Sequence, residues 1–352
     1  MILQAIEYEG FRNLVDGHLD FNPDFNLITG ENGAGKTNLL EAIFFTAYGV
    51  SFRTNDEKNI LKFNQPYLRV TGTSDTNIGS IFYNGVKKYV LNGNEKNRAS
   101  DYVGWLPLIT MSLNDIWIIK GAPAQRRNFL DWLLIKLNPV YGANLSEYRK
   151  VLRQRNSFLQ QKDREKDISL LDVYNEQLIM WGNVIYEERR KIFPVLEEGI
   201  KQKGTYMGLH KISIEYHSSC PDMKLSLEQI KRNENIEIKR GETIIGPHRD
   251  DLYITIDGNP ARNFASEGEC RLIALILKLT ESEILQRAIN DQPIFLLDEI
   301  TIELDSKHRQ SFFDSLRGQV FYSTIQDPND FKISNKTTFI VQRGHFALST
   351  AN

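Results

Sequence analysis

An eight-residue glycine-rich segment constrains this chain more than any other feature of its sequence. Residues 30–37 read GENGAGKT, a complete G-x-x-x-x-G-K-[ST] pattern between the apolar run 25–29 and good helix sequence at 38–45. Glycines let successive backbone N–H groups point inward around an anion, and a following helix adds a favourable dipole. We therefore expect ATP to be bound by Gly30, Glu31, Asn32, Gly33, Ala34, Gly35, Lys36 and Thr37.

Two side chains of this loop have distinct chemical roles. Lys36 is expected to bring positive charge to the β and γ phosphates, and the Thr37 hydroxyl is a hard oxygen ligand suited to Mg²⁺. We also place Arg12 and Asn13 in the nucleotide site. The alternative is a glycine-rich turn that binds nothing, but all four fixed positions are filled and both flanking segments agree with the motif.

The run 294–299 (IFLLDE) supplies the second half of a nucleotide site. It is apolar and ends in Asp298 and Glu299, a pattern typical of a buried strand that presents carboxylates at the edge of a parallel sheet. We expect Asp298 to hold Mg²⁺ through water and Glu299 to act as the catalytic general base on the attacking water. Such a strand is common by chance, and the phosphate loop makes the match specific.

The order of these motifs indicates a subclass. The phosphate loop lies near the N-terminus, helical sequence occupies the middle, and residues 266–269 (SEGE) precede a long helix upstream of Asp298. This order resembles that of the ABC-type ATPases, in which a Ser-x-Gly signature binds the γ phosphate held by the opposite subunit. Ser266 and Gly268 are therefore expected to complete the site of a second copy, although Ser-Glu-Gly alone is a routine helix N-cap.

The length and periodicity predict two lobes. A chain of 352 residues exceeds one core of ordinary size. Short β-rich runs with Asn-Gly turns surround the phosphate loop, whereas residues 123–240 show helical periodicity. We predict an α/β fold: an ABC-type P-loop ATPase head (residues 1–115 and 243–352), with a mixed sheet around the phosphate-loop helix, and an inserted α-helical lobe (116–242).

Bulk properties favour a cytoplasmic protein. No apolar run is long enough to span a bilayer, and the N-terminus begins with strand-like sequence without a basic leader. Cys220 and Cys270 lie far apart without metal-ligand spacing, as expected in a reducing compartment. The net charge of −2 gives no support to nucleic-acid binding, which must therefore depend on local basic patches.

Four blocks resemble the RecF family of bacterial DNA replication and repair proteins. They occur in the family's order and span almost the whole chain: residues 30–43 (GENGAGKTNLLEAI), 51–54 (SFRT), 120–131 (KGAPAQRRNFLD) and 246–252 (GPHRDDL). The resemblance implies a weak, DNA-stimulated ATPase of the SMC-like group without long coiled-coil arms. It further implies ATP-dependent homodimerisation, binding to DNA at gaps or single/double-strand junctions, and work with RecR and RecO to load RecA.

Several positions depart from that family pattern. The signature usually reads close to Ser-Gln-Gly-Gln-Gln-Arg, whereas this chain carries Glu267 and Glu269, and acids beside a phosphate are expected to weaken dimerisation. Glu299 stands where the family usually has a second aspartate. Thr324 takes the place of the switch histidine of ABC transporters, and residues 112–115 offer no Q-loop glutamine.

Two basic segments are candidates for DNA contacts. Arg149 and Arg153 share a helix face by their i,i+4 spacing, in a stretch that also contains Lys150, Arg155, Lys162 and Arg164. A solvated helix face is an equal alternative. Arg126 and Arg127 form the second candidate, with one of them paired to Asp131. For His248 and Arg249 we favour a structural role in a turn.

Other functions were compared with this one. The ATPase subunit of a membrane transporter usually carries a Leu-Ser-Gly-Gly-Gln signature, which this chain lacks. A defence ATPase of the OLD type requires an acidic nuclease domain, and residues 306–352 are too few for one. A nucleotide-switched structural adaptor that hardly cleaves ATP stays open as an alternative.

Overall fold

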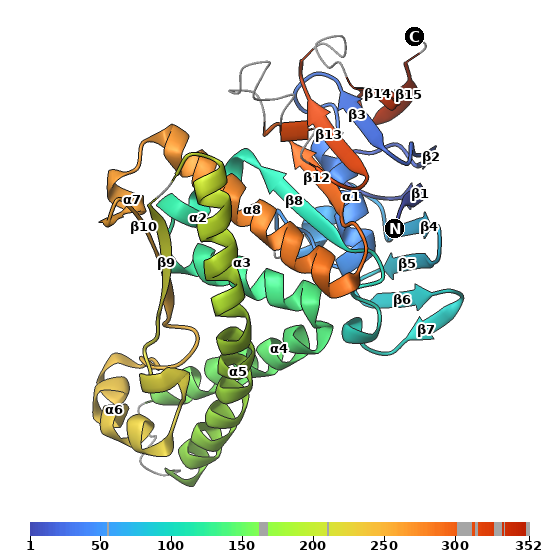
Figure 1. Ribbon diagram of the computed structural model, residues 1–352. Coiled ribbons are helices and arrows are strands. Elements are labelled where there is room, and N and C mark those ends of the chain that lie inside the picture. Colours follow the sequence, from blue (N-terminus) through green and yellow to red (C-terminus); the bar gives the residue numbers. More distant parts are fainter. Residues whose placement is uncertain are drawn as a thin grey trace. The chain divides into compact units, whose positions relative to one another are not determined.

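The computed structural model describes residues 1–54, 56–161, 168–209, 211–300, 312–313, 316–326, 333 and 335–349. The chain divides into two compact units, Met1–Asn114 with Leu285–Asn352 and Asp115–Ile284 (Figure 1). Each unit has its own elements and its own buried side chains. None of the helices within the described ranges is long and apolar enough to cross a membrane.

The first unit contains a mainly parallel sheet in the order β15-β14-β3-β13-β12-β8. Four of its five parallel strands, β3, β8, β12 and β13, are mostly buried, as central parallel strands usually are, whereas β14 is only partly buried and β15 (His345–Leu348) pairs with it antiparallel at the edge. The parallel strands are β3 (Phe25–Thr29), β8 (Leu108–Ser112), β12 (Ile294–Asp298), β13 (Val320–Thr324) and β14 (Lys336–Gln342).

A second sheet of this unit is antiparallel, in the order β2-β1-β4-β5-β6-β7. Its last hairpin turns through Asn92 and Gly93, both with positive φ (52° and 77°), as a tight Asn-Gly turn requires. The strands are β1 (Leu3–Glu9), β2 (Gly17–Asp20), β4 (Leu68–Ser74), β5 (Ile78–Tyr83), β6 (Lys87–Leu91) and β7 (Asn94–Lys96).

Helix α1 (Lys36–Tyr48) contacts both sheets of the first unit, namely β4 and β5 of one and β12 and β13 of the other. Nearly all of its side chains are buried, including those on opposite helix faces, because a helix between two sheets has no face left for solvent. It ends at Gly49, whose φ of 67° stops the helix. Short 3₁₀ turns follow at η1 (Glu57–Ile60) and η2 (Ala99–Asp101).

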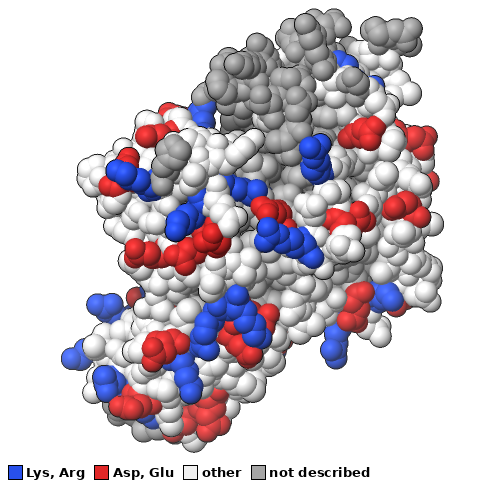
Figure 2. Space-filling model, in the orientation of Figure 1, with Lys and Arg blue, Asp and Glu red and all other residues white. Residues whose placement is uncertain are grey.

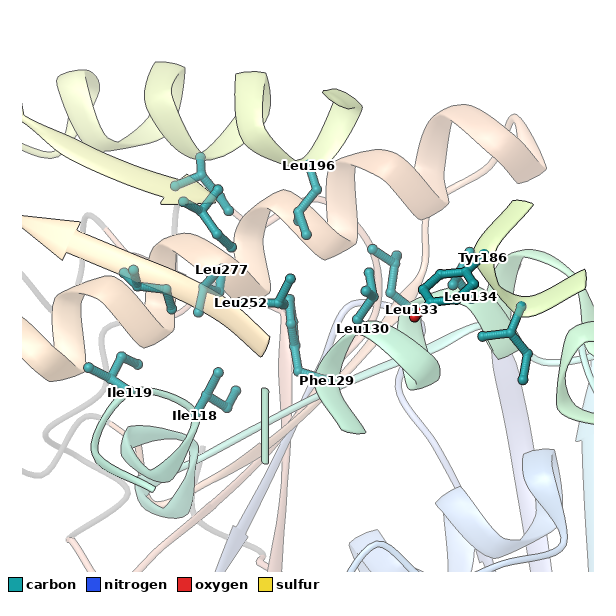
Figure 3. Packing of buried hydrophobic residues seen from close by; sticks show 14 of the residues in the cluster. Ile118, Ile119, Phe129, Leu130, Leu133, Leu134, Tyr186, Leu196, Leu252 and Leu277 are labelled. Carbon is teal, nitrogen blue, oxygen red and sulfur yellow. The ribbon is translucent and has the colours of Figure 1, made fainter. Parts of the chain in front are cut away.

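The second unit is mostly helical. Leu130 and Leu133 on α3, Leu196 on α5 and Leu277 on α8 meet in its core (Figure 3). Its helices are α2 (Trp117–Lys120), α3 (Pro123–Leu137), α4 (Pro139–Leu159), α5 (Ile168–Tyr206), α6 (Leu227–Arg240), α7 (Ala261–Phe264) and α8 (Glu267–Ile289), with 3₁₀ turns η3 (Leu113–Ile116) and η5 (Pro221–Met223) near or within it.

An antiparallel sheet of the second unit was not predicted. Strand β9 (Ile212–His217) pairs with β10 (Asp251–Ile256), which continues into β11 (Asn259–Pro260). β9 lies inside the segment predicted to be helical. The boundary also differs from the predicted one: residues 243–284 belong to the second unit, because Leu252 and Leu277 pack into its core.

Candidate functional site

The phosphate loop connects β3 to α1 as its sequence predicts. Gly33 and Gly35 adopt φ values of +78° and +123°, which other residues rarely adopt, so the loop's path requires glycine at both positions. Within the described residues, no side chain caps the start of α1 at Lys36. The first N–H groups of the helix therefore stay available to an anion.

Lys36 lies over this loop and is almost entirely buried. Its Nζ donates to the Gly30 carbonyl at 2.9 Å and to the Glu31 carbonyl at 3.2 Å. The same Nζ lies 3.4 Å from Glu299 Oε1. The ammonium group is thus held at the loop by partners that phosphate oxygens can replace.

Thr37 and Asp298 meet at the C-terminal edge of the parallel sheet. Thr37 Oγ1 lies 3.1 and 3.0 Å from the two Asp298 carboxylate oxygens. Ser323, which is paired with Asp298 in the parallel register of β12 and β13, also donates its hydroxyl to this carboxylate. Two hydroxyls around one carboxylate form a hard oxygen donor set, and this set fits Mg²⁺. Ser323 was missed as a candidate, although its place at the end of the next apolar strand was a usable signal.

Glu299 follows Asp298 in the left-handed region, with φ of 56°. Its backbone N–H donates to the Ser323 carbonyl at 3.1 Å, and its side chain approaches Lys36. A non-glycine residue in this conformation is strained, so the surrounding structure holds it there. The strand edge thereby presents two successive carboxylates, one to Thr37 and one to Lys36.

An open pocket of about 630 Å³ lies beside these residues in the first unit. It contains the predicted Arg12 and Asn13; Asn13 Nδ2 donates to the Gly33 carbonyl at 3.1 Å. Five lining residues had no predicted role at this site. The pocket is lined by Arg12, Asn13, Asn32, Gly33, Gly35, Lys36, Thr37, Asn38, Arg53, Asn59, Leu61, Phe63 and Glu299.

Glu41 on α1 anchors the arginines of this pocket. Its fully buried carboxylate receives two hydrogen bonds from Arg12, Nε at 2.9 Å and NH2 at 2.7 Å, and lies 3.4 Å from Arg53 NH1. The Ser51 hydroxyl donates to the same carboxylate. The Glu41 carboxylate therefore holds the guanidinium groups of Arg12 and Arg53 at the pocket. Its role was not predicted, since its partners are brought to it by the fold.

The predicted signature lies at the exposed start of α8 in the second unit. Ser266 and Glu269 form a capping box: the Ser266 N–H donates to Glu269 Oε2 at 2.8 Å, and the Glu269 N–H donates to Ser266 Oγ at 3.3 Å. The Glu269 carboxylate accepts hydrogen bonds from the Ser266 N–H and from the Ser266 hydroxyl, and these two bonds lower the pKa of the carboxyl. Glu267 pairs with Arg271 at 2.7 Å. Both acids that depart from the family signature thus have partners of their own.

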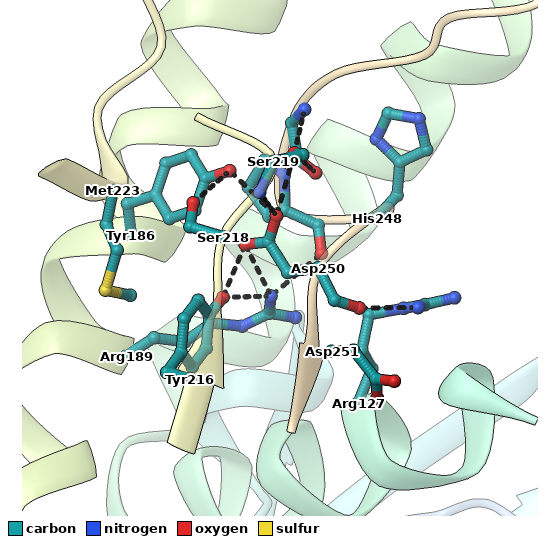
Figure 4. Close-up of polar contacts among 12 residues, drawn as sticks. Arg127, Tyr186, Arg189, Tyr216, Ser218, Ser219, Met223, His248, Asp250 and Asp251 are labelled. Carbon is teal, nitrogen blue, oxygen red and sulfur yellow. Dashed lines mark hydrogen bonds and ion pairs between the residues drawn. The ribbon is translucent and has the colours of Figure 1, made fainter. Parts of the chain in front are cut away.

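The blocks at 120–131 and 246–252 meet in a polar network inside the second unit (Figure 4). Asp250 accepts hydrogen bonds from Tyr216 at 2.6 Å, Tyr186 at 3.2 Å and Ser219 at 2.8 Å. Arg189 bonds to Asp131 at 2.8 Å; burial alone would lower the pKa of Arg189, but Asp131 together with Tyr141 and Tyr216 outweighs burial and holds that pKa above its ordinary value. These blocks build the interior of this unit.

Three of the arginines predicted to contact DNA have partners within this unit; Arg126 and Arg155 are buried and Arg127 is half-buried. Arg126 forms two hydrogen bonds with Asp251, at 2.7 and 2.9 Å. Asp131, which we expected to pair with Arg126 or Arg127, pairs instead with Arg149 and Arg189. Arg127 donates to the Asp250 carbonyl at 2.7 Å, and burial lowers its pKa. Arg155 is fully buried against Glu237, with 2.7 Å between NH2 and Oε2. Because Arg126 and Arg155 are buried and paired within the chain, they are not available for the predicted DNA contacts. Arg127 is half-buried and donates to a backbone carbonyl, so little of its guanidinium group is left for DNA.

Arg149, Lys150 and Arg153 are exposed on α4, as predicted for a basic stripe. Arg149 also pairs with Asp131 at 3.1 Å. Lys162 and Arg164 lie outside the described residues. On the face of the molecule in Figure 2, basic side chains lie among acidic ones, so phosphate contacts there would come from short clusters.

His248 and Arg249 hold a turn through hydrogen bonds within the chain, which agrees with the structural role that we favoured for them. His248 Nδ1 lies 2.6 Å from the Tyr148 hydroxyl, and Nε2 lies 3.1 Å from the Thr243 carbonyl. The carbonyl requires a donor, so Nε2 carries the proton and Nδ1 accepts from Tyr148. Burial lowers the pKa of His248 to about 4. Arg249 donates to the same Thr243 carbonyl and pairs with Glu242 at 2.8 Å.

Comparison with known proteins gives consistent results. The family described as RecF/RecN/SMC N terminal domain matches residues 2–329. DNA replication and repair proteins RecF from Lactobacillus acidophilus and Bacillus cytotoxicus are each 34% identical to the chain; the first match covers all of both chains, and the second covers 91% of this chain and 90% of the relative.

Solved structures of the recombination mediator protein RecF in the RecFOR pathway are also similar. The RecF-ATPrS structure matches with a TM-score of 0.92 and 30% identity, over 98% of this chain and 97% of that one. The RecF-ATP structure matches with a TM-score of 0.88 and 29% identity, over 99% and 98%. An Smc head domain from Pyrococcus furiosus, at 16% identity and a TM-score of 0.53, shares the fold. The predicted ABC-type ATPase head fold is thus confirmed.

Proposed function

Because the chain belongs to the RecF family of DNA replication and repair proteins, we propose that it is an ATP-dependent DNA-binding protein of recombinational gap repair. The observation that carries this proposal is the assembly of Lys36, Thr37, Asp298 and Glu299 around one loop at one sheet edge. ATP is the expected nucleotide, since solved relatives include RecF-ATP. The chain is then an ABC-type ATPase.

The arrangement supports hydrolysis as follows. The loop N–H groups and Lys36 bind the phosphates, while Thr37 and Asp298 hold Mg²⁺, which when bound neutralises charge on the phosphate oxygens. Glu299 lies next in the chain after Asp298 and is the residue proposed to accept a proton from the attacking water. Its carboxylate faces Lys36. Phosphate binding would draw Lys36 away and free Glu299 to act as a base.

Gly268 supports a site that a second copy completes. Its backbone is helical, and a Cβ built on it meets nothing within 4 Å inside the chain. Glycine weakens a helix, so nothing within the described residues explains its presence there. A phosphate that approaches the backbone from another molecule would require it, as glycines do in other phosphate-binding turns. Ser266 and Gly268 of one copy are proposed to meet the ATP of the other.

A nucleotide site completed by a second copy would make dimerisation depend on ATP, and the proposed role on DNA follows from that dependence. ATP binding would drive dimerisation on DNA at gaps or single/double-strand junctions, and weak, DNA-stimulated hydrolysis would release the dimer. The proposed partners are RecR, together with RecO and RecA in the same pathway. The exposed stripe of Arg149, Lys150 and Arg153 is the proposed DNA contact on α4.

Sedimentation and DNA binding test this function together. The Glu299→Gln protein is expected to bind ATP, to sediment as a dimer at saturating ATP and as a monomer with ADP, and to bind gapped DNA only in the dimer form. Lys36→Ala, the matched control, should stay monomeric with either nucleotide. A Glu299→Gln protein that stays monomeric at saturating ATP would exclude the dimer switch.

A further inference from the structure

The pocket beside the phosphate loop has two kinds of wall. Apart from glycines, nearly all of its lining side chains are polar or charged and come mainly from the loop, α1 and the arginines held by Glu41. The exceptions are Leu61 and Phe63, which come from one short segment after η1. A pocket with a cationic wall and an apolar wall matches a molecule that is a polyanion at one end and a flat ring at the other.

Phe63 is unusually exposed for a side chain in a firmly held segment. Its side chain is 89% exposed. Its neighbours are fixed by backbone hydrogen bonds: Lys62 N–H to the Gly10 carbonyl at 2.9 Å and Arg12 N–H to the Ile60 carbonyl at 2.8 Å. The Lys62 side chain bonds at 2.8 Å to the Leu14 carbonyl. The backbone is thereby held against the chain while the phenyl ring stays in the pocket opening.

The turn at this segment keeps the ring accessible. The Gln65 N–H donates to the Lys62 carbonyl at 3.0 Å, and Asn64 takes φ of 63°, so Phe63 lies at the tip of a tight turn. Leu61 is half-buried beside Phe11, with which it forms an isolated β-bridge. One fixed aliphatic side chain and one exposed aromatic ring therefore line the same pocket.

We propose that Phe63, supported by Leu61, is the platform on which the base of the bound nucleotide stacks. The proposal rests on the ATP site described above and adds the part of the protein that recognises the nucleoside. Stacking covers the exposed ring, and it distinguishes a nucleotide from an inorganic phosphate chain. Phe63 is thus a specificity-determining residue, separate from the phosphate-binding residues.

Calorimetric titration of the full chain with ADP and with inorganic pyrophosphate tests this role. These two ligands share their phosphates, differ in the nucleoside, and carry no γ phosphate to promote dimerisation. Phe63→Ala is expected to weaken ADP binding about tenfold and to change pyrophosphate binding by less than about twofold, given typical stacking energies. Phe63→Tyr should restore ADP binding, because it restores the ring.

Val86→Ala is the matched control, since Val86 is 69% exposed on the same unit and does not line the pocket. It should bind both ligands as the wild type does. Equal losses for ADP and pyrophosphate in Phe63→Ala, or no loss of ADP binding, would overturn the platform. Unchanged ADP binding with weaker DNA binding would assign Phe63 to a DNA contact instead. A wild-type protein that bound neither ligand would overturn the ATP site itself and the platform with it.

Discussion

Among single residues, Glu41 shows how the nucleotide site depends on a buried charge outside the motif. Its carboxylate holds Arg12 with two hydrogen bonds and approaches Arg53, and both arginines line the pocket. The motif spacing fixed the roles expected of Lys36 and Thr37, because those roles depend on local chain geometry. The partners of Glu41 lie 29 and 12 residues away in the chain, and only the folded chain brings them together.

Replacement of Glu41 tests this anchoring role. Glu41→Ala leaves a largely buried Arg12 without its carboxylate and should lower the free energy of unfolding by about 3 kcal/mol. It should also weaken ATP binding, since both arginines lose their positions. Glu41→Gln keeps an acceptor and should lose less of both. Chemical denaturation and calorimetry measure the two effects, and an Ala variant as stable as the wild type would contradict this account.

His248 makes the stability of the second unit sensitive to acid. Its pKa is about 4 in the folded chain and about 6.5 when unfolded, so the unfolded state binds the extra proton first as pH falls. The stabilisation is complete above about pH 6.5 and is lost as pH falls toward 4. Denaturation at a series of pH values should show this slope, and His248→Gln, which has no titrating ring, should be flatter between pH 6.5 and 5. Identical slopes would contradict the role given to the neutral ring.

At the scale of elements, the start of α8 combines a capping box with a glycine that the fold does not need. Gly268→Ala should therefore stabilise the isolated chain slightly, by about 0.5 kcal/mol, because alanine favours the helix. The same Cβ should obstruct a phosphate from a second copy and weaken ATP-dependent dimerisation about tenfold or more. Thermal unfolding and sedimentation give these two results. A variant that dimerises as well as the wild type would remove the reason proposed for this glycine.

Helix α4 provides the cleanest test of DNA contact. Among the described residues Arg153 forms no ion pair, whereas reversing Arg149 would place a carboxylate against Asp131. Arg153→Glu should weaken DNA binding and lower the slope of affinity against salt by about 0.9 for each phosphate that the variant no longer neutralises. Lys201→Glu, an equal charge change at an exposed position of α5, is the matched control. Equal effects of the two variants would indicate a general charge effect and not a direct role of α4.

For the whole molecule, sequence patterns predicted what depends on neighbouring residues and missed what depends on distant ones. The phosphate loop, β12 and α8 were predicted because their motifs and periodicities are local. Arg155 lies two residues after Arg153, on the opposite and buried face of α4, and its partner Glu237 is 82 residues away, so only the folded chain shows why a charge is buried there. β9 was missed because its pairing partner follows a helix, and the domain boundary because β10 and α8 pack into the second unit.

The phosphate-loop residues lie in the first unit and the signature residues in the second. We propose that a complete ATP site forms when the phosphate loop of one copy meets the signature of another. Mixing two inactive variants tests this claim most directly. Lys36→Ala lacks a working phosphate loop and Ser266→Arg lacks a working signature, so each alone should neither dimerise with ATP nor hydrolyse it. A mixed dimer has one site with both parts intact, and the mixture is predicted to regain ATP-dependent association and hydrolysis. A mixture as inactive as its components would contradict a site shared between two copies.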